Sequence, residues 1–206
     1  MDKSQLIEQF KAVSFPTLGH FLEEGFADSQ LRAMVPNVKL VGRALTLKLV
    51  GADAIAVNQA LVLIKPGDVL VIDTGGDWQH APVGAVTSCA ASCAGAAGIV
   101  VDGAVTDLLE LREGGLPVFA RGTSLLTTKL RSDPGSAMGV AVTCGAVTVR
   151  PGDWVLADDN GVFIASDEVL GGVIDLALAS DAAEPMLIER IRNGEPLEQQ
   201  LQVEPG

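Results

Sequence analysis

Apolar residues in this chain recur with two different periods, one typical of helices and one typical of strands. Near the start, Leu6, Ile7, Phe10 and Val13 follow the helical period with charged residues between them, which predicts an amphipathic helix. Apolar runs bounded by glycine, proline or aspartate predict buried strands. These predicted strands span 38–51, with an interruption at Gly42, then 69–73, 98–103 and 117–122.

Helical patterns separate these strands. The predicted helices span 16–25, 52–64, 84–94 and 106–115. Gly25 stands where a glycine cap would close the first of them. Small residues make up most of 84–94, so we expect a buried helix that a sheet can approach closely. Because strands alternate with helices, the sequence predicts parallel pairing in an α/β fold.

The pattern changes after Gly139. Short apolar segments separated by turn residues predict an antiparallel layer, and from Asp167 the chain returns to a helical pattern that we expect Pro185 to break. The segments 65–73 and 150–158 share one sequence pattern: a basic residue, then Pro-Gly-Asp, then an apolar strand that ends in aspartate. We interpret residues 1–206 as one domain, with N-terminal helices within 1–37 and C-terminal helices within 167–206.

Charge and cysteine content exclude several functions. Lys and Arg number 14 against 26 Asp and Glu in 206 residues, a net charge of −12. Nucleic acid is therefore not an expected partner, because phosphate binding needs clustered cations. Three cysteines in an Ala- and Gly-rich setting indicate reduced thiols and a cytoplasmic protein. The uncharged stretch 81–101 lacks the sustained Leu, Ile and Phe of a membrane span, so no membrane association is expected.

Candidate functional residues gather where the predicted parallel strands end. Asp73 and Asp102 end two strands, Thr106 and Asp107 follow the second, and Arg121 lies at the end of the next. In open α/β sheets, ligands bind outside the carboxyl ends of the strands. These residues therefore define the expected pocket.

A polar loop, 74–83, contributes His80 and leads into Gly84, Ala85 and Val86 at the start of the small-residue helix. Free N–H groups at a helix start, with the positive end of the dipole, can receive a carboxylate or an enolate oxygen. A nearby aspartate can hold Mg²⁺ directly or through water. His80 is a candidate acid or base. The sequence contains no P-loop, serine-hydrolase elbow or zinc-peptidase motif.

Each of these residues also has a structural interpretation. Asp107 is an acid in the first turn of a helix, and Thr106 is a good N-cap residue. Asp102 before a glycine is typical of a turn, and Arg121 can simply pair with a carboxylate. His20, within an apolar helical pattern, is more typical of a structural histidine than of a catalytic one.

A family resemblance rests on the order of five segments: "GRALT", "PGDVLVIDTGG", "GIVVDGAVTD", "LPVFARG" and "VTVRPGDWVLADDNGV". This order resembles the RraA-like family, which includes 4-hydroxy-4-methyl-2-oxoglutarate aldolases and ribonuclease E activity regulators. The resemblance runs from about Pro16 to Gly194. It implies a β/β/α sandwich, a homotrimer or a dimer of trimers with sites at subunit contacts and, in the aldolase branch, a divalent metal and pyruvate as product.

The sequence departs from the aldolase branch at the expected pocket. Thr106 stands where that branch has an arginine for the substrate carboxylate, while Asp107 keeps the position of the metal-binding aspartate. Ala85 replaces an acidic residue that assists the metal through water, and Gly19-His20 replaces an early Ser-Asp pair. The late helix often offers an acid to a neighbouring subunit, and Asp181 or Glu184 could correspond.

Two functional hypotheses remain. The first is a divergent metal-dependent lyase, of class II aldolase or oxaloacetate decarboxylase type, that cleaves a C–C bond of a small 2-oxo acid. Its metal, Mg²⁺ or Mn²⁺, would bind Asp107, with Asp102 as a further ligand. Its substrate would contact 84–86, Thr106 and Arg121. The remaining catalytic candidates are His80, Glu184 and again Arg121. The second hypothesis is a non-catalytic regulatory or binding protein with a degraded site.

Overall fold

The structure is a computed structural model that describes residues 3–203. Its helices are α1 (Lys3–Ala12), α2 (Phe15–Leu18), α3 (Ala54–Leu63), α4 (Ala85–Cys93), α5 (Leu108–Gly114), α6 (Asp167–Arg192) and α7 (Leu197–Gln200). Its strands are β1 (Arg32–Ala33), β2 (Leu40–Lys48), β3 (Asp68–Asp73), β4 (Gly98–Val105), β5 (Val118–Thr123), β6 (Ala137–Met138), β7 (Val142–Cys144), β8 (Val147–Val149), β9 (Trp154–Asp158) and β10 (Gly161–Ala165).

One mixed sheet organises the molecule. Its strand order is β1-β5-β4-β3-β2-β9-β10, with β6 beside β2, and β7 and β8 form a separate hairpin. Strands β2 to β5 pair in parallel, whereas β9 pairs antiparallel with both β2 and β10. The predicted parallel α/β layer and the antiparallel layer after it are both confirmed. In β3 and β4 the apolar run is buried on both faces, as central parallel strands require.

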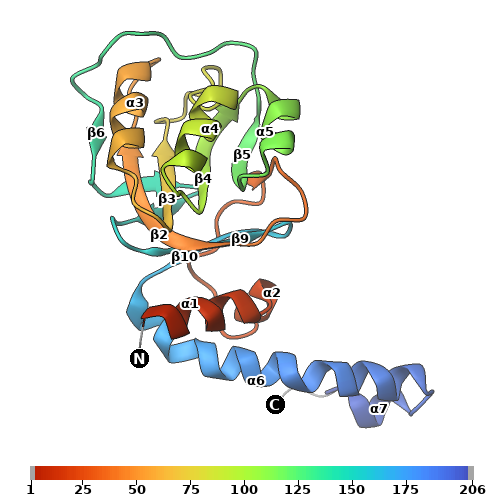
Figure 1. The fold of residues 1–206 in the computed structure, drawn as a ribbon. Coiled ribbons are helices and arrows are strands. Elements are labelled where there is room, and N and C mark those ends of the chain that lie inside the picture. The colour runs from red at the N-terminus through yellow and green to blue at the C-terminus, as the bar shows by residue number, and fades with distance from the viewer. Residues whose placement is uncertain (1–2, 204–206) are drawn as a thin grey trace.

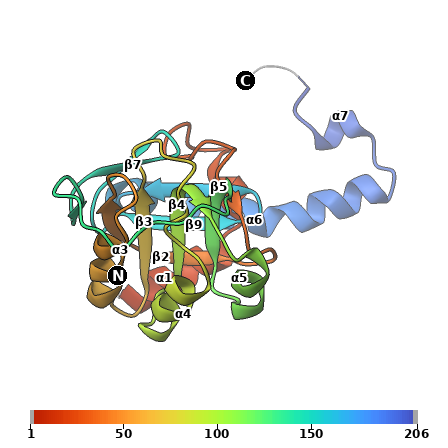
Figure 2. The same ribbon diagram turned by 90° about the horizontal axis from the view of Figure 1, so that it is seen from above.

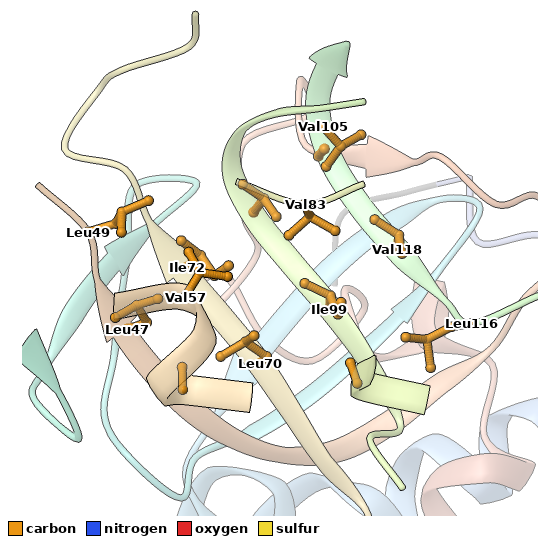
Figure 3. Close-up of a cluster of buried hydrophobic side chains, with 14 of the residues drawn as sticks. Leu47, Leu49, Val57, Leu70, Ile72, Val83, Ile99, Val105, Leu116 and Val118 are labelled. Atoms are coloured by element: carbon orange, nitrogen blue, oxygen red, sulfur yellow. The ribbon is translucent and has the colours of Figure 1, made fainter. Parts of the chain in front are cut away.

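Helices α3, α4 and α5 cover one face of the parallel strands (Figure 1). The core beneath them is aliphatic, with Leu70, Ile72 and Ile99 fully buried, and Figure 3 shows these side chains converging between sheet and helices. Helix α4 packs its small residues Ser88 and Ala91 inward but leaves its opposite side open, with Val86 84% exposed. The expectation of a fully buried helix is therefore wrong, since only the sheet side of α4 is covered.

Helices α1, α2 and α6 pack on the antiparallel end of the sheet (Figure 1). Phe10 meets Trp154 there with the ring centroids 4.8 Å apart. The second half of α6 extends away from the body and leads to α7 (Figure 2). Pro185 does not break α6, which runs without interruption from 167 to 192. A single proline removes one hydrogen bond, and the residues around it form helix well.

The predicted helix 16–25 is also wrong, because α2 ends at Leu18. Gly25 does not cap it. Instead Gly25 (φ +91°) lies beside β10, where its carbonyl accepts from Ile164 N at 2.8 Å and a Cβ would stand 2.6 Å from the Ile164 carbonyl oxygen. His20 consequently lies in an exposed turn, not inside a helix.

The repeated Pro-Gly-Asp pattern forms the same turn in both segments. Asp68 Oδ2 accepts from Lys65 N and Asp153 Oδ2 accepts from Arg150 N, at 2.9 and 2.7 Å. The strands that follow run in opposite directions, because β3 is parallel to β2 and β9 is antiparallel to it. Asp158, the last residue of β9, therefore lies at the opposite end of the strands from Asp73, the last residue of β3.

The three cysteines are free thiols, two exposed on α4 and one, Cys144, buried. Burial raises the pKa of the Cys144 thiol well above its ordinary value. Among residues 3–203, no helix combines the length and the apolar character needed to cross a bilayer.

Candidate functional site at the ends of the parallel strands

Asp107 is held in an uncommon backbone conformation between β4 and α5. Its φ and ψ of 53° and 47° are left-handed, a region that aspartate tolerates better than most residues. It is the N-cap residue of α5, so Thr106 does not cap this helix as its residue type indicated. Thr106 Oγ1 instead lies 3.3 Å from Asp107 Oδ1. The left-handed turn places the Asp107 carboxylate at the start of α4.

The start of α4 meets that carboxylate. Asp107 Oδ2 accepts a hydrogen bond from Ala85 N at 2.9 Å. Gly84 makes this approach possible, since a Cβ there would stand 2.5 Å from Asp107 Oδ2. A hydrogen bond of 2.9 Å from Thr106 N to Val83 O joins the two segments beside the contact. The structure thus brings together four of the residues that the sequence analysis selected: Gly84, Ala85, Thr106 and Asp107.

Two backbone donors next to the Asp107 contact have no acceptor among the described residues. The first N–H groups of a helix have no intrahelical partner. In α4, Ala85 N donates to Asp107 and Ser88 N donates to Gly84 O, whereas Val86 N and Thr87 N donate to none of residues 3–203. With the positive end of the helix dipole, these two amides can receive an anionic oxygen.

Arg121 is occupied by two carboxylates. Its Nε donates to Asp102 Oδ1, its Nη1 donates to Asp28 Oδ2 at 3.0 Å, and its guanidinium lies 4.7 Å from the Trp78 ring centroid. The arginine side chain is only 11% exposed. Burial opposes the charged form, yet hydrogen bonds to Asp102 and Asp28 raise the pKa of Arg121 above its ordinary value. The alternative interpretation of Arg121, a carboxylate partner, is therefore confirmed.

Asp102 has both carboxylate oxygens engaged within the chain. Oδ1 accepts from Arg121 and Oδ2 accepts from Gly145 N at 2.9 Å. It does not lie in a simple turn, since β4 continues to Val105 with a register shift against β5 between Val101 and Ala104. Its register neighbour Asp73 accepts from Thr143 N at 3.0 Å. Asp73 ends β3, whereas Asp102 lies within β4 and does not end its strand as expected. The two acids together fasten the β7 region to the parallel sheet.

His80 is oriented by Asp77. Its Nδ1 lies 2.7 Å from Asp77 Oδ2, and the two side chains are 28% and 26% exposed. Burial opposes ionisation of Asp77, but hydrogen bonds from Gln79 N and His80 lower the pKa of its carboxyl. A carboxylate on Nδ1 favours a proton there and leaves Nε2 as the basic nitrogen. Among the described residues, no hydrogen bond joins His80 to Thr106 or Asp107.

Glu184 lies elsewhere in the same chain. It lines a cavity of about 430 Å³ with Lys39, Asp158 and Asp181 at the antiparallel end of the sheet. Asp181 points back to α2, where its carboxylate accepts from Ser14 N and Thr17 Oγ1. Sequence reasoning missed this docking role, because nothing in the local pattern identifies a contact across more than 160 residues.

Asp107 is the exposed carboxylate among the strand-end acids described above. No group of three or more His, Cys, Asp or Glu side chains within residues 3–203 is arranged to hold a metal. Mg²⁺ commonly binds through one or two carboxylates and keeps several waters. The exposed Asp107, which among residues 3–203 accepts only from Ala85 N and Thr106 Oγ1, keeps lone pairs for such a hydrated ion, whereas Asp102 is committed to the buried Arg121 and to Gly145.

The fold and these strand ends define a class: a mixed α/β protein with an exposed aspartate beside the start of a helix that packs on the parallel strands. The family model for RraA-like proteins, described as Aldolase/RraA, matches residues 5–164. The chain belongs to the RraA-like family, as its sequence resemblance indicated.

Named relatives fall into two groups. The chain is 34% identical over 160 residues to a putative 4-hydroxy-4-methyl-2-oxoglutarate aldolase of Halalkalibacterium halodurans. The aligned region covers 77% of this chain and 75% of that protein. It is 41% identical over 154 residues to a protein of the same description from Paraburkholderia phytofirmans. That aligned region covers 70% of this chain and 90% of the relative. The solved RNA-processing inhibitor RraA from Thermus thermophilis has a TM-score of 0.65 at 29% identity and covers 74% of this chain and 92% of its own.

Proposed function

We propose that this protein is a metal-assisted lyase that cleaves a C–C bond of a small 2-oxo acid and releases pyruvate. The observation that carries the proposal is the Asp107 carboxylate, held over the start of α4 by Ala85 N at 2.9 Å beside two free amides. The aldolase-type relatives at 34% and 41% identity support the same reaction class. The match of the RraA inhibitor supports the family but not this chemistry.

Asp107 is the residue that would hold Mg²⁺ or Mn²⁺, with water and substrate oxygens filling the remaining positions. When bound, such a cation acts as a Lewis acid that polarises the 2-oxo group. Asp102 is a weaker candidate ligand, because metal binding would compete with the buried Arg121. Glu184 could take part only from a second copy of the chain, since in its own chain it lies at the antiparallel end.

The chain's own groups would bind the substrate and move protons. The amides of Val86 and Thr87 receive a carboxylate or the developing enolate oxygen, and Thr106 Oγ1 adds a hydroxyl beside them. His80 Nε2, with Nδ1 held by Asp77, removes a proton from the substrate hydroxyl as the C–C bond breaks. The bonding electrons pass to the enolate, which then gains a proton and becomes pyruvate.

A second function is favoured by a different observation. Thr106 stands in place of the aldolase arginine, and Arg121 cannot replace that arginine without leaving Asp102 and Asp28. A site without a free arginine would bind a dicarboxylic substrate more weakly by a few kcal/mol. The alternative is therefore a non-catalytic regulatory or binding protein that keeps the family fold.

The test is pyruvate release from oxaloacetate and from 4-hydroxy-4-methyl-2-oxoglutarate, with Mg²⁺ or Mn²⁺ and with EDTA. We expect metal-dependent turnover that Asp107→Ala abolishes. Glu110→Ala is the matched control, because Glu110 is an exposed acid on the same helix. Turnover that survives in EDTA or in Asp107→Ala would refute the assigned role of Asp107, and no turnover on either substrate would favour the non-catalytic alternative.

A further inference from the structure

An aromatic cavity lies at the antiparallel end of the sheet, away from the strand ends that carry Asp107. It has a volume of about 250 Å³ and is bounded by α2, the segment 26–29 and the β9–β10 hairpin. Its walls include Phe15, Phe26 and Phe163, with Leu156 and Val162 behind them. None of the residues assigned to the proposed lyase lines it.

The cavity walls are held in place by the core. Phe15, Leu156 and Phe163 are 5%, 0% and 3% exposed, so they are fixed by packing on their outer sides. Phe26 is 38% exposed and lies over Phe163, with 4.8 Å between ring centroids. A hydrogen bond of 2.9 Å from Ala27 N to Val162 O ties this segment to β10. Only the Phe26 side of the cavity is open to adjustment.

One ionisable side chain lines the cavity, and it is acidic. Asp158 ends β9, and its Oδ1 accepts from Asn160 N at 2.8 Å, while Oδ2 accepts no hydrogen bond from residues 3–203. Lys39 does not line this cavity, although it interacts electrostatically with Asp158 and lines the neighbouring cavity together with it. Its ammonium donates to Val13 O at 2.6 Å and lies over the Phe15 ring. The cavity therefore offers aromatic faces and one available carboxylate oxygen.

We propose that this cavity binds a small organic ammonium ion that carries one aromatic ring. The ring packs against Phe15, Phe26 and Phe163, and the ammonium donates to Asp158 Oδ2. An apolar cavity of about 150 Å³ is enough for benzene, so about 250 Å³ accommodates one ring with a short amine-bearing chain. A carboxylate and aromatic faces both attract a cation, whereas Asp158 repels an anion.

Calorimetric titration with three probes of one shape tests the proposal: 2-phenylethylammonium, 2-phenylethanol and 3-phenylpropionate. We expect the ammonium to bind about tenfold or more tightly than the alcohol, since a hydrogen bond to a charged group at a partly buried site is worth at least about 1.4 kcal/mol. The carboxylate should not bind detectably. Equal affinities for all three probes, or no binding of the ammonium up to about 10 mM, would overturn the proposal.

Variants locate the binding and separate it from the lyase site. Asp158→Asn keeps an oxygen for Asn160 N and should remove the preference for the ammonium over the alcohol. Asp159→Asn is the matched control, because it removes the same charge one residue away, where Asp159 holds Asn37 N outside the cavity. Ser29→Phe, at an exposed wall position, should block all probes by bulk. Asp107→Ala should leave the affinity unchanged. Ammonium selectivity that survives in Asp158→Asn would also contradict the proposal.

Discussion

Asp107 and Ala85 meet across two elements, since the Asp107 carboxylate accepts from the Ala85 amide at 2.9 Å. The aspartate lies before α5 and the alanine begins α4, so neither helix alone creates the contact. The sequence resemblance implies an acidic side chain at the Ala85 position in the aldolase branch of the family. Here the backbone of that position binds the surviving aspartate. The contact makes the site sensitive to small changes at the helix start.

Gly84→Ala should displace Asp107. The added Cβ would stand 2.5 Å from Asp107 Oδ2 and 2.8 Å from Thr106 Cγ2, so the loop must shift. We expect a loss of about 1–3 kcal/mol in unfolding free energy and a fall of tenfold or more in pyruvate release. Urea unfolding and the coupled assay measure both. Gly114→Ala is the control, because its Cβ would meet nothing within 4 Å, and an unchanged Gly84→Ala protein would contradict the packing at the site.

Thr106→Arg should strengthen the interaction with a dicarboxylic 2-oxo acid. A charged hydrogen bond contributes about 1.5–3 kcal/mol, so we expect kcat/KM to rise about tenfold or more. Thr106→Lys should recover less, because lysine lacks the planar fork that binds a carboxylate with two parallel bonds. Steady-state kinetics on both substrates measure the effect. If arginine and lysine act alike, bidentate recognition at this position is excluded.

Asp53 should make the protein acid-sensitive. Its buried carboxylate caps α3 through Ala56 N and also accepts from Asp133 N, both at 2.8 Å. Burial opposes ionisation, but these bonds together lower the pKa of Asp53 below its ordinary value. The Asp53 carboxylate therefore binds a proton more readily in the unfolded chain than in the folded one. Its contribution to the free energy of unfolding is complete above about pH 4 and is lost as the pH falls through the lower pKa of the folded state.

Asp53→Asn should show a smaller loss of unfolding free energy between pH 5 and pH 3 than the wild type, with about 1–2 kcal/mol lost at neutral pH. Urea titrations across that range supply the measurement. Glu110→Gln, an exposed acid in the first turn of α5, serves as control and should keep the wild-type slope. An unchanged slope in Asp53→Asn would show that another acid governs the transition.

Asp181→Ala should loosen the N-terminal helices. Its carboxylate accepts from Ser14 N at 2.6 Å and from Thr17 Oγ1, and no local contact replaces these. We expect faster hydrogen exchange in α1 and α2 and a loss of about 0.5–1.5 kcal/mol, the usual net contribution of a hydrogen bond. Asp175→Ala, an exposed change on the same helix, should leave exchange in α1 and α2 unchanged. Equal exchange in both variants would mean that apolar packing alone docks α6.

Secondary structure was predictable where one period persisted over a whole element. The four parallel strands and the helices α3 to α5 were expected from apolar runs and turn residues, and all are present. The helix expected at 16–25 failed because Gly25 pairs with β10, a strand about 140 residues away. Pro185 was expected to end a helix that continues to Arg192. Both errors arose where one local signal was given more weight than its surroundings.

The sequence by itself determined the alternation of strands and helices, the family, and the placement of Asp102, Asp107 and Arg121 toward the carboxyl ends of the parallel strands. Those features depend on residue type and on spacing along the chain. Only the tertiary structure decided how each charge is used: Asp102 with Arg121 in a buried pair, and Asp107 turned through a left-handed backbone toward Ala85. A carboxylate's role depends on which donors surround it, and these donors come from distant segments that only the folded chain brings together.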